Sequence, residues 1–196
     1  GDIAERYYTV GQYMKEVKDV SKAMAAAGDS YICDEYLNAM GSPEAESVYV
    51  LHDLNNDGIE EFFIGLKFNY DIPYYVIYDV YTWKDGRAYQ LMRGIGYRNG
   101  SCKICENGVI EDNYSGSAWD GQTLYHILPE GGIELETIDS VSSRRDGTVQ
   151  SYYHWNELID ENSLQTILEQ YQPESVTYVD CNRETIEQLR LSGIRK

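Results

Sequence analysis

Basic residues are scarce in this chain: its 196 residues include 16 Lys and Arg against 33 Asp and Glu, a formal net charge of −17. This charge repels phosphate backbones and anionic lipid surfaces, so we expect no nucleic-acid partner. Long apolar runs are also missing. The longest, such as residues 62–66, fall far short of the roughly 18 residues of a membrane-spanning helix. We therefore expect no membrane-spanning segment.

Targeting signals are missing as well. The chain begins at Gly1 without a basic segment or an apolar one behind it. We expect any targeting segment to have been removed or to lie outside this sequence.

Cysteine is sparse, with four copies, and two of them form a C-x-x-C pair: Cys33, Cys102, Cys105 and Cys181. In an extended strand, Cα atoms three residues apart are about 10 Å from each other, and a disulfide spans at most about 7 Å. The close pair should therefore not bridge. The sequence favours buried free thiols, with one or two long-range disulfides or a zinc site as alternatives.

Residue patterns typical of catalysis are absent. The three histidines, His52, His126 and His154, form no ligand pair at helical spacing, and we expect them to be structural. Ser117 lies in a segment rich in Ser and Gly that lacks the G-x-S-x-G pattern. No catalytic residue is predicted.

The first 41 residues predict a helical segment. Apolar residues recur every three or four positions from Ile3 to Ala27, the spacing of one buried helix face, and Gly28 ends the run. Asp29 and Ser30 are candidate N-caps for a second, shorter helix ending at residue 41. Its buried side is expected to contain Cys33, Tyr36, Leu37 and Met40.

Residues 46–155 predict an antiparallel β-meander of about eight or nine strands. Turn-forming pairs separate β-branched and aromatic runs: Asp57-Gly58, Asp85-Gly86, Asn107-Gly108, Gly131-Gly132 and Asp146-Gly147. Connections this short require antiparallel pairing, and we expect three residues, 84–86, to join the strands on either side of Asp85-Gly86. One strand should bury Ile133 and Leu135 and expose Glu134 and Glu136.

The last part, residues 156–196, predicts helices. Apolar spacing indicates a helix from Leu158 to Tyr171, and Pro173 breaks it. A short strand at residues 175–179 and a helix over residues 184–191 should follow. We therefore predict a single α+β domain over residues 1–196, with helices on one face or end of a curved antiparallel sheet.

One loop between two strand-like runs has the oxygen spacing of a cation site. Side-chain oxygens occur at alternate positions in Asp53, Asn55 and Asp57, and Gly58 at position 6 allows a sharp turn. The carbonyl of Ile59 can fill position 7. Position 12, where an EF-hand has Glu, is apolar, so the loop is not an EF-hand. The alternative is a turn that uses its Asp and Asn side chains to cap its own backbone and binds nothing.

Residues 53–65 resemble the β-hairpin calcium loop of FG-GAP and VCBS-type repeats. The resemblance implies that Glu61, at position 9, completes a calcium site with Asp53, Asn55, Asp57 and Ile59. More loosely, the whole layout is similar to uncharacterised extracytoplasmic proteins and lipoproteins of Gram-positive bacteria. That similarity implies an extracytoplasmic location, secreted or anchored at the cell surface.

Tyrosine is abundant, with 19 copies. The rings in residues 70–83 and 152–155 can form a recognition patch for a glycan or protein, or they can simply line a sheet under helices. Our leading hypothesis is a non-catalytic extracytoplasmic domain with a structural Ca²⁺ and a Tyr-rich binding surface. A hydrolase of glycan or peptide, assembled from His126 or His154, a carboxylate and Ser117, is the alternative. An assembly module of a surface protein is a third possibility.

Overall fold

A computed structural model describes residues 2–17, 32–95, 102–115, 119–129, 132–142 and 149–193. The chain divides into two compact units, each with its own sheet. Unit 1 comprises Gly1–His52, Glu61–Ile95 and Thr177–Lys196, and unit 2 comprises Asp53–Glu60 and Gly96–Val176. The single-domain organisation of residues 1–196 stays a prediction.

Unit 1 begins with two helices that follow the predicted apolar spacing. Helix α1 (Asp2–Val17) buries side chains at intervals of three or four residues: Ala4, Tyr7, Val10 and Met14. Helix α3 (Asp34–Met40) ends at Gly41 and buries Tyr36, Leu37 and Met40, as predicted. The two helices meet through a perpendicular ring contact between Tyr7 and Tyr36, with centroids 4.9 Å apart.

Part of the predicted helical segment lies outside the described residues. Residues 18–28 and the candidate N-caps Asp29 and Ser30 belong to it, and Cys33 is the N-cap of α3 in the structure.

The sheet of unit 1 has five antiparallel strands in the order β11-β1-β2-β3-β4. Their bounds are β1 (Ala45–His52), β2 (Glu61–Phe68), β3 (Tyr74–Lys84), β4 (Arg87–Arg93) and β11 (Val179–Asp180). Asp85 and Gly86 join β3 to β4 with positive φ angles of 53° and 74°. Since Lys84 already pairs with Arg87, this predicted hairpin has a two-residue turn instead of the three residues expected.

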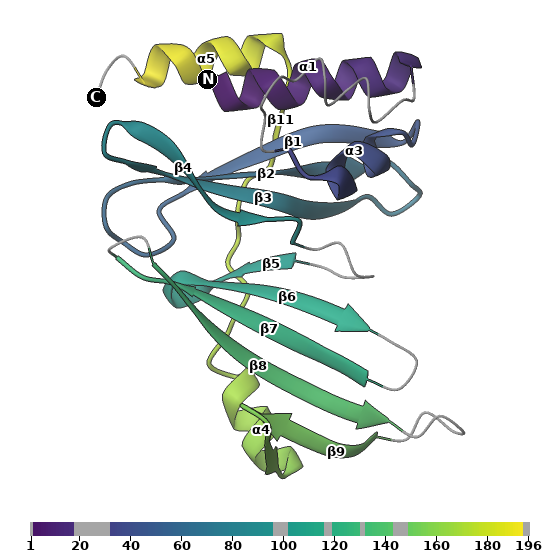
Figure 1. Cartoon of the computed structure of the whole chain (residues 1–196), viewed down its shortest axis with the longest axis vertical. Coiled ribbons are helices and arrows are strands. Elements are labelled where there is room, and N and C mark those ends of the chain that lie inside the picture. Colours follow the sequence, from purple (N-terminus) through teal and green to yellow (C-terminus); the bar gives the residue numbers. More distant parts are fainter. Residues whose placement is uncertain are drawn as a thin grey trace. The chain divides into compact units, whose positions relative to one another are not determined.

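Helices cover one face of this sheet. Figure 1 shows α1 and α5 (Arg183–Gly193) above the strands. Side chains of α1, α3 and α5 form one core with the sheet, which contributes Tyr49, Ile64, Leu66, Phe68, Val76, Tyr78 and Tyr81. Many tyrosines of unit 1 are thus core residues. The sequence alternative in which the rings line a sheet under helices holds for these.

A fully buried carboxylate, Asp79, lies in this core. The Tyr7 hydroxyl donates to Asp79 Oδ2, and the backbone N–H of Gly94 donates to Oδ1 at 3.1 Å. The hydroxyls of Tyr7 and Tyr81 are also hydrogen-bonded, at 3.0 Å. Burial raises the pKa of Asp79, because a charged carboxylate loses its hydration there.

Unit 2 has a six-stranded antiparallel sheet in the order β10-β9-β8-β7-β6-β5. Its strands are β5 (Cys102–Cys105), β6 (Val109–Ser115), β7 (Trp119–Ile127), β8 (Ile133–Ser142), β9 (Val149–His154) and β10 (Glu157–Ile159). Asn107 and Gly108 form the predicted turn between β5 and β6, with φ angles of 64° and 79°. Asp146, Gly147 and Gly131 lie outside the described residues.

Helix α4 (Glu161–Leu168) belongs to unit 2 and packs on its sheet. It begins later than predicted, because Leu158 and Ile159 form β10 and Asp160 caps the helix by accepting from the Ser163 N–H at 2.7 Å. Apolar residues of α4 and Tyr171 behind it cover a small core of Cys105, Val109, Leu124 and Ile138.

The predicted α+β class is confirmed, with two differences. The described residues hold eleven strands instead of eight or nine, and these form two sheets instead of one curved sheet. The short β10 is an unpredicted strand, turned back by Trp155 and Asn156 at positive φ, and β11 overlaps the predicted strand at residues 175–179. No helix in the described part of the chain is long and apolar enough to cross a membrane.

Candidate functional site

The predicted cation loop connects β1 to β2 and winds around the carboxylate of Asp53. The backbone N–H of Asp57 donates to Asp53 Oδ1 at 3.1 Å, and that of Gly58 donates to Oδ2 at 2.9 Å. Gly58 has φ of 86°, a conformation that a residue with a side chain adopts only with strain. The turn is therefore closed by its first acidic residue.

Two further predicted ligands join the same turn. Asn55 Oδ1 accepts from the Asp57 N–H at 3.2 Å, and Asp57 Oδ1 accepts from the Ile59 N–H at 2.7 Å. The amide of Asn55 also donates to Asp57 Oδ2 at 3.2 Å. The structure thus brings Asp53, Asn55, Asp57 and the Ile59 backbone together in one loop.

The fifth predicted ligand, Glu61, is placed differently. It begins β2 in unit 1, where it is fully buried and accepts from the Thr82 hydroxyl at 3.1 Å. Its role as a ligand stays a prediction of the family resemblance.

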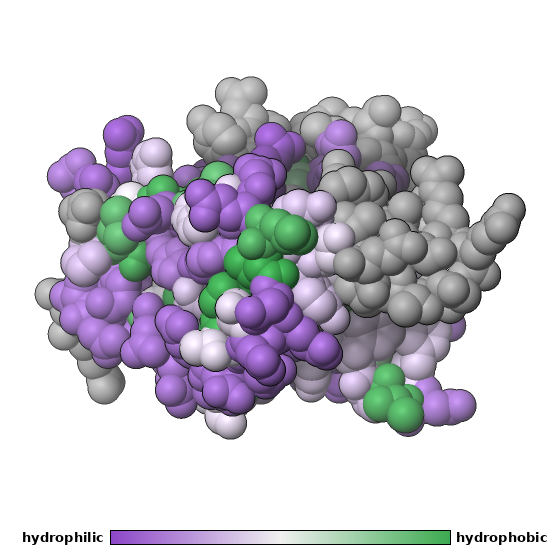
Figure 2. Space-filling model, turned by 90° about the horizontal axis from the view of Figure 1, so that it is seen from below, coloured by the Kyte–Doolittle hydropathy of each residue, from purple (hydrophilic) through white to green (hydrophobic). Residues whose placement is uncertain are grey.

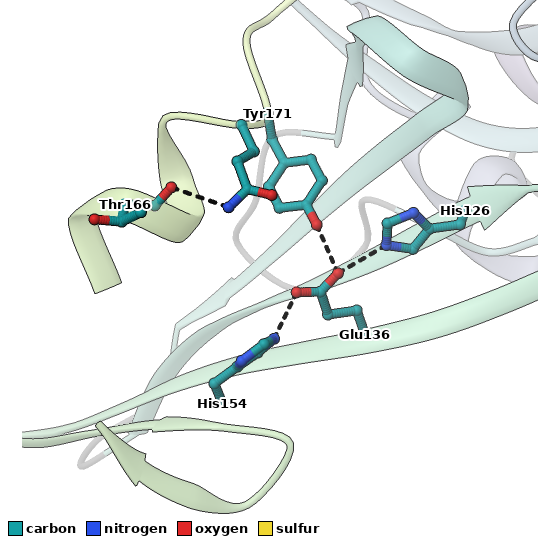
Figure 3. Close-up of polar contacts among 6 residues, drawn as sticks. His126, Glu136, His154, Thr166 and Tyr171 are labelled. Carbon is teal, nitrogen blue, oxygen red and sulfur yellow. Dashed lines mark hydrogen bonds and ion pairs between the residues drawn. The ribbon is translucent and has the colours of Figure 1, made fainter. Parts of the chain in front are cut away.

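A separate polar cluster lies on the sheet of unit 2, centred on Glu136 of β8. His126 Nε2 on β7 is 2.8 Å from Glu136 Oε2, and His154 Nε2 on β9 is 2.6 Å from Oε1. Figure 3 shows the carboxylate lying between the two rings. Three neighbouring strands therefore supply one hydrogen-bonded group.

A tyrosine from outside the sheet completes this cluster. The Tyr171 hydroxyl, just beyond α4, donates to Glu136 Oε2 at 2.7 Å, and its ring meets His126 edge-on, with centroids 5.8 Å apart (Figure 3). Burial by itself would raise the pKa of Glu136. The hydrogen bonds from Tyr171, His126 and His154 outweigh burial and lower that pKa, so Glu136 is ionised at neutral pH.

Ionisation of Glu136 fixes the proton positions of both imidazoles. An ionised carboxylate only accepts, so each Nε2 must donate, and a neutral ring then keeps its lone pair on Nδ1. Both His side chains are about one quarter exposed. Chemically, this arrangement can accept a proton at either Nδ1 while Glu136 stabilises the resulting imidazolium.

Sequence reasoning missed this cluster for a definite reason. We expected Leu135 to be buried and Glu136 to be exposed, but Leu135 is 49% exposed and Glu136 only 7%. Glu134 is exposed as predicted, but Leu135 is exposed too, because α4 and Tyr171 cover the face that carries Glu136. Ser117, the nucleophile considered for a hydrolase, lies outside the described residues.

Metal ligation by the usual side chains finds no further support. Among the described residues, no group of three or more His, Cys, Asp or Glu side chains could hold a metal ion. In the Glu136 cluster, the carboxylate stands between the two imidazoles, which keeps them from converging on one ion. The loop of residues 53–59 offers only two such side chains, Asp53 and Asp57. Its other oxygens come from the Asn55 amide and the Ile59 carbonyl, which are not counted in a group of that kind.

All four cysteines are free and buried, as the sequence favours. Burial raises the pKa of Cys105 to about 11 and that of Cys181 to about 12, which leaves them as thiols at neutral pH. Cys102 and Cys105 both lie in β5 and are not bridged. A thiolate nucleophile is not supplied by these residues.

Exposed aromatic side chains form the third candidate region. Tyr70 and Tyr74 flank the β2–β3 turn, and each is about half exposed. Trp83 and Tyr89 are exposed on β3 and β4 of the same unit. On the face seen in Figure 2, hydrophobic residues form small separate patches among hydrophilic ones.

Comparisons with protein-family models, with curated proteins and with solved structures find no match for this chain.

Proposed function

We propose that this chain is a non-catalytic extracytoplasmic binding domain whose loop at Asp53, Asn55, Asp57, Ile59 and Glu61 holds a structural Ca²⁺ and whose Tyr-rich surface contacts a glycan or protein. One observation carries the calcium part: backbone N–H groups gather the side-chain oxygens of Asp53, Asn55 and Asp57 into a single turn.

The negative charge of this turn favours the binding of a cation. Within the described residues, neither Asp53 nor Asp57 forms an ion pair, so their mutual repulsion is not offset by a basic side chain. Each carboxylate oxygen that accepts one N–H keeps a second lone pair. A hard cation bound by those lone pairs would remove the repulsion and stiffen the loop.

The calcium affinity typical of extracellular modules supports the proposed compartment. Extracellular calcium modules bind the ion with dissociation constants of roughly 10⁻⁴ to 10⁻³ M, so they fill only where calcium is abundant. We expect the proposed site to bind calcium in that range. An extracytoplasmic domain, secreted or anchored at the cell surface, fits this affinity.

Calcium titration of chelator-treated protein tests the proposal. With these dissociation constants, 10 mM calcium should stabilise the fold by about 1.4 to 2.7 kcal/mol. For a chain of this size, that raises Tm by about 3 to 10 °C. Asp57→Asn keeps the acceptor for the Ile59 N–H but removes a charge, and it should abolish both the binding heat and the shift.

The matched control is Asp71→Ala, which removes an exposed carboxylate from a different loop and should leave the calcium response intact. Absence of both heat and Tm shift in the wild type at 10 mM calcium would reduce the loop to a self-capped turn.

A second candidate function, a hydrolase of glycan or peptide, is favoured by the Glu136 cluster. Both histidines named for that alternative share one carboxylate, as an acid–base site would require. Turnover of chromogenic glycosides and peptides by the wild type, lowered about 100-fold in Glu136→Gln and unchanged in Glu134→Gln, would establish it. Without turnover in the wild type, the binding domain stands alone.

A further inference from the structure

The turn between β2 and β3, residues 69–73, exposes a large apolar side chain next to two half-exposed tyrosine rings. Ile72 is 83% exposed at its tip, and Tyr70 and Tyr74 are 51% and 47% exposed. Exposed apolar groups gathered in one place commonly mark a binding surface. This place lies wholly within unit 1.

The exposed rings stack against each other in parallel. Tyr70 and Tyr74 have centroids 5.9 Å apart and planes within 14° of parallel. Phe68, which is buried, lies parallel to both within 18°, at 4.9 Å from Tyr74 and 6.3 Å from Tyr70. The buried ring thereby fixes the orientation of the two exposed ones.

Backbone features make this surface rigid before any ligand arrives. Phe68 pairs with Tyr74 at the end of the β-ladder, and Pro73 fixes its own φ immediately before that pair. The Asn69 N–H donates to the Glu44 carbonyl at 3.0 Å, which ties the turn to the residues that lead into β1. A preformed surface loses little entropy on binding.

Polar groups line a groove beside the rings. The groove has a volume of about 630 Å³ and is lined by Glu44, Asn69, Tyr70, Asp71 and Ile72. The Ser42 hydroxyl donates to Glu44 Oε2 at 2.7 Å and holds that carboxylate in place. The groove therefore combines the Tyr70 ring and the Ile72 side chain with two carboxylates and an amide.

We propose that this groove binds a neutral glycan, with a pyranose ring lying on Tyr70, which Tyr74 and Phe68 hold in place by stacking. The C–H face of a pyranose is flat and apolar, and its hydroxyls can donate to Glu44 and Asp71 and exchange hydrogen bonds with Asn69. The assignment rests on the proposed function, because it names the ligand class of the same Tyr-rich surface.

Charge and ring geometry select this ligand over two others. Two carboxylates in the groove and a net charge of −17 repel acidic sugars and phosphorylated ligands. A cationic ligand such as a methylated amine is best held by rings that surround it as a cage. Here the rings are stacked in parallel and only Tyr70 lines the groove, which offers no cage for a cation but suits one flat neutral ring.

Calorimetry with neutral hexasaccharides of glucose, mannose, galactose and N-acetylglucosamine tests the assignment. At least one should bind the wild type with millimolar or better affinity, and Tyr70→Ala should weaken it about threefold to tenfold. Tyr70→Phe keeps the ring and should retain most of the binding. Tyr89→Ala, which removes an equally exposed tyrosine on β4, is the matched control and should bind as the wild type does.

Two results would overturn the glycan assignment. One is the absence of binding by every hexasaccharide at 10 mM, and the other is binding that Tyr70→Ala leaves unchanged. Poly-lysine serves as a further probe: if it binds, and Tyr70→Ala weakens that binding, the Tyr-rich recognition surface stands and the glycan falls. Calcium binding is measured separately, so failure here leaves the calcium loop untouched.

Discussion

Asp79 in unit 1 and Glu136 in unit 2 are both buried carboxylates that accept a tyrosine hydroxyl, yet their pKa values shift in opposite directions. Asp79 is fully buried, and loss of hydration dominates, so its pKa is raised. Glu136 retains a little exposure and accepts from three side chains, so its pKa is lowered. Both carboxylates accept several hydrogen bonds, so the depth of burial decides which protonation state each one favours.

The two carboxylates also differ in their contact with solvent. Asp79 lies under α1, where it is fully buried and hydrogen-bonded by the Tyr7 hydroxyl, the Gly94 N–H and Cys33. Glu136 is bonded to imidazoles that are themselves partly exposed. Only the second arrangement offers partly exposed side chains that a ligand can reach.

Removal of the buried carboxylate of unit 1 should have the largest effect. Asp79→Ala leaves the Tyr7 hydroxyl and the Gly94 N–H without their acceptor and opens a cavity, which we expect to lower the free energy of unfolding by about 3 kcal/mol. Urea denaturation measures it. The control, Asp71→Ala in an exposed turn, should change that free energy by less than about 0.5 kcal/mol. Equal losses in both variants would contradict the structural role of Asp79.

Glu136→Gln should be the next largest. Its amide cannot accept from all three donors, so we expect a loss of about 1 to 3 kcal/mol at pH 7. Because the folded pKa of Glu136 is lowered, its contribution is present above the unfolded value and is lost as pH falls through the folded value. The cost of the substitution, measured by urea denaturation, should shrink from pH 7 toward pH 3. Glu134→Gln is the control, and a constant cost would argue against the lowered pKa.

Local patterns in the sequence were sufficient for much of the fold. The buried faces of α1 and α3 and the turns at Asp85-Gly86 and Asn107-Gly108 depend on residues close in the chain. They form at the predicted residues, although α3 begins only at Asp34 and the first turn is one residue shorter than expected. The loop that begins at Asp53 is equally local, so its oxygen spacing was visible in advance. Turn chemistry and helical periodicity act over a few residues.

Long-range packing explains what the sequence could not provide. Alternation in β8 was evident, but whether Leu135 or Glu136 faces inward depends on α4, which is more than twenty residues away. The convergence of His126 and His154 on one carboxylate requires the register of three strands. The division into two sheets is likewise a property of pairing, and no single segment carries it.

The contribution of Asp79 to the free energy of unfolding should change with pH in the opposite direction to that of Glu136. A raised folded pKa means that the contribution of Asp79 is fully present below its unfolded pKa and is lost as pH rises through the folded value. Asp79→Asn keeps the shape of the side chain but cannot ionise. Its free energy of unfolding, relative to that of the wild type, should therefore be higher at pH 7 than at pH 4. Urea denaturation at both values measures this difference. The same pH trend in Asp79→Asn and Glu136→Gln would contradict the contrast between the two units.

Loss of a single donor to Glu136 should produce the smallest change. Tyr171→Phe keeps the ring packed against the small core of unit 2 but removes one hydrogen bond, which we expect to cost about 0.5 to 1.5 kcal/mol. Since that bond also helps to lower the pKa of Glu136, the pKa should rise, and carboxyl NMR over a pH titration can follow it. The control is Tyr152→Phe, which alters another half-buried tyrosine of unit 2 and should leave the pKa of Glu136 unchanged. A pKa of Glu136 that is the same in both variants would mean that the two imidazoles alone hold this carboxylate in its ionised form.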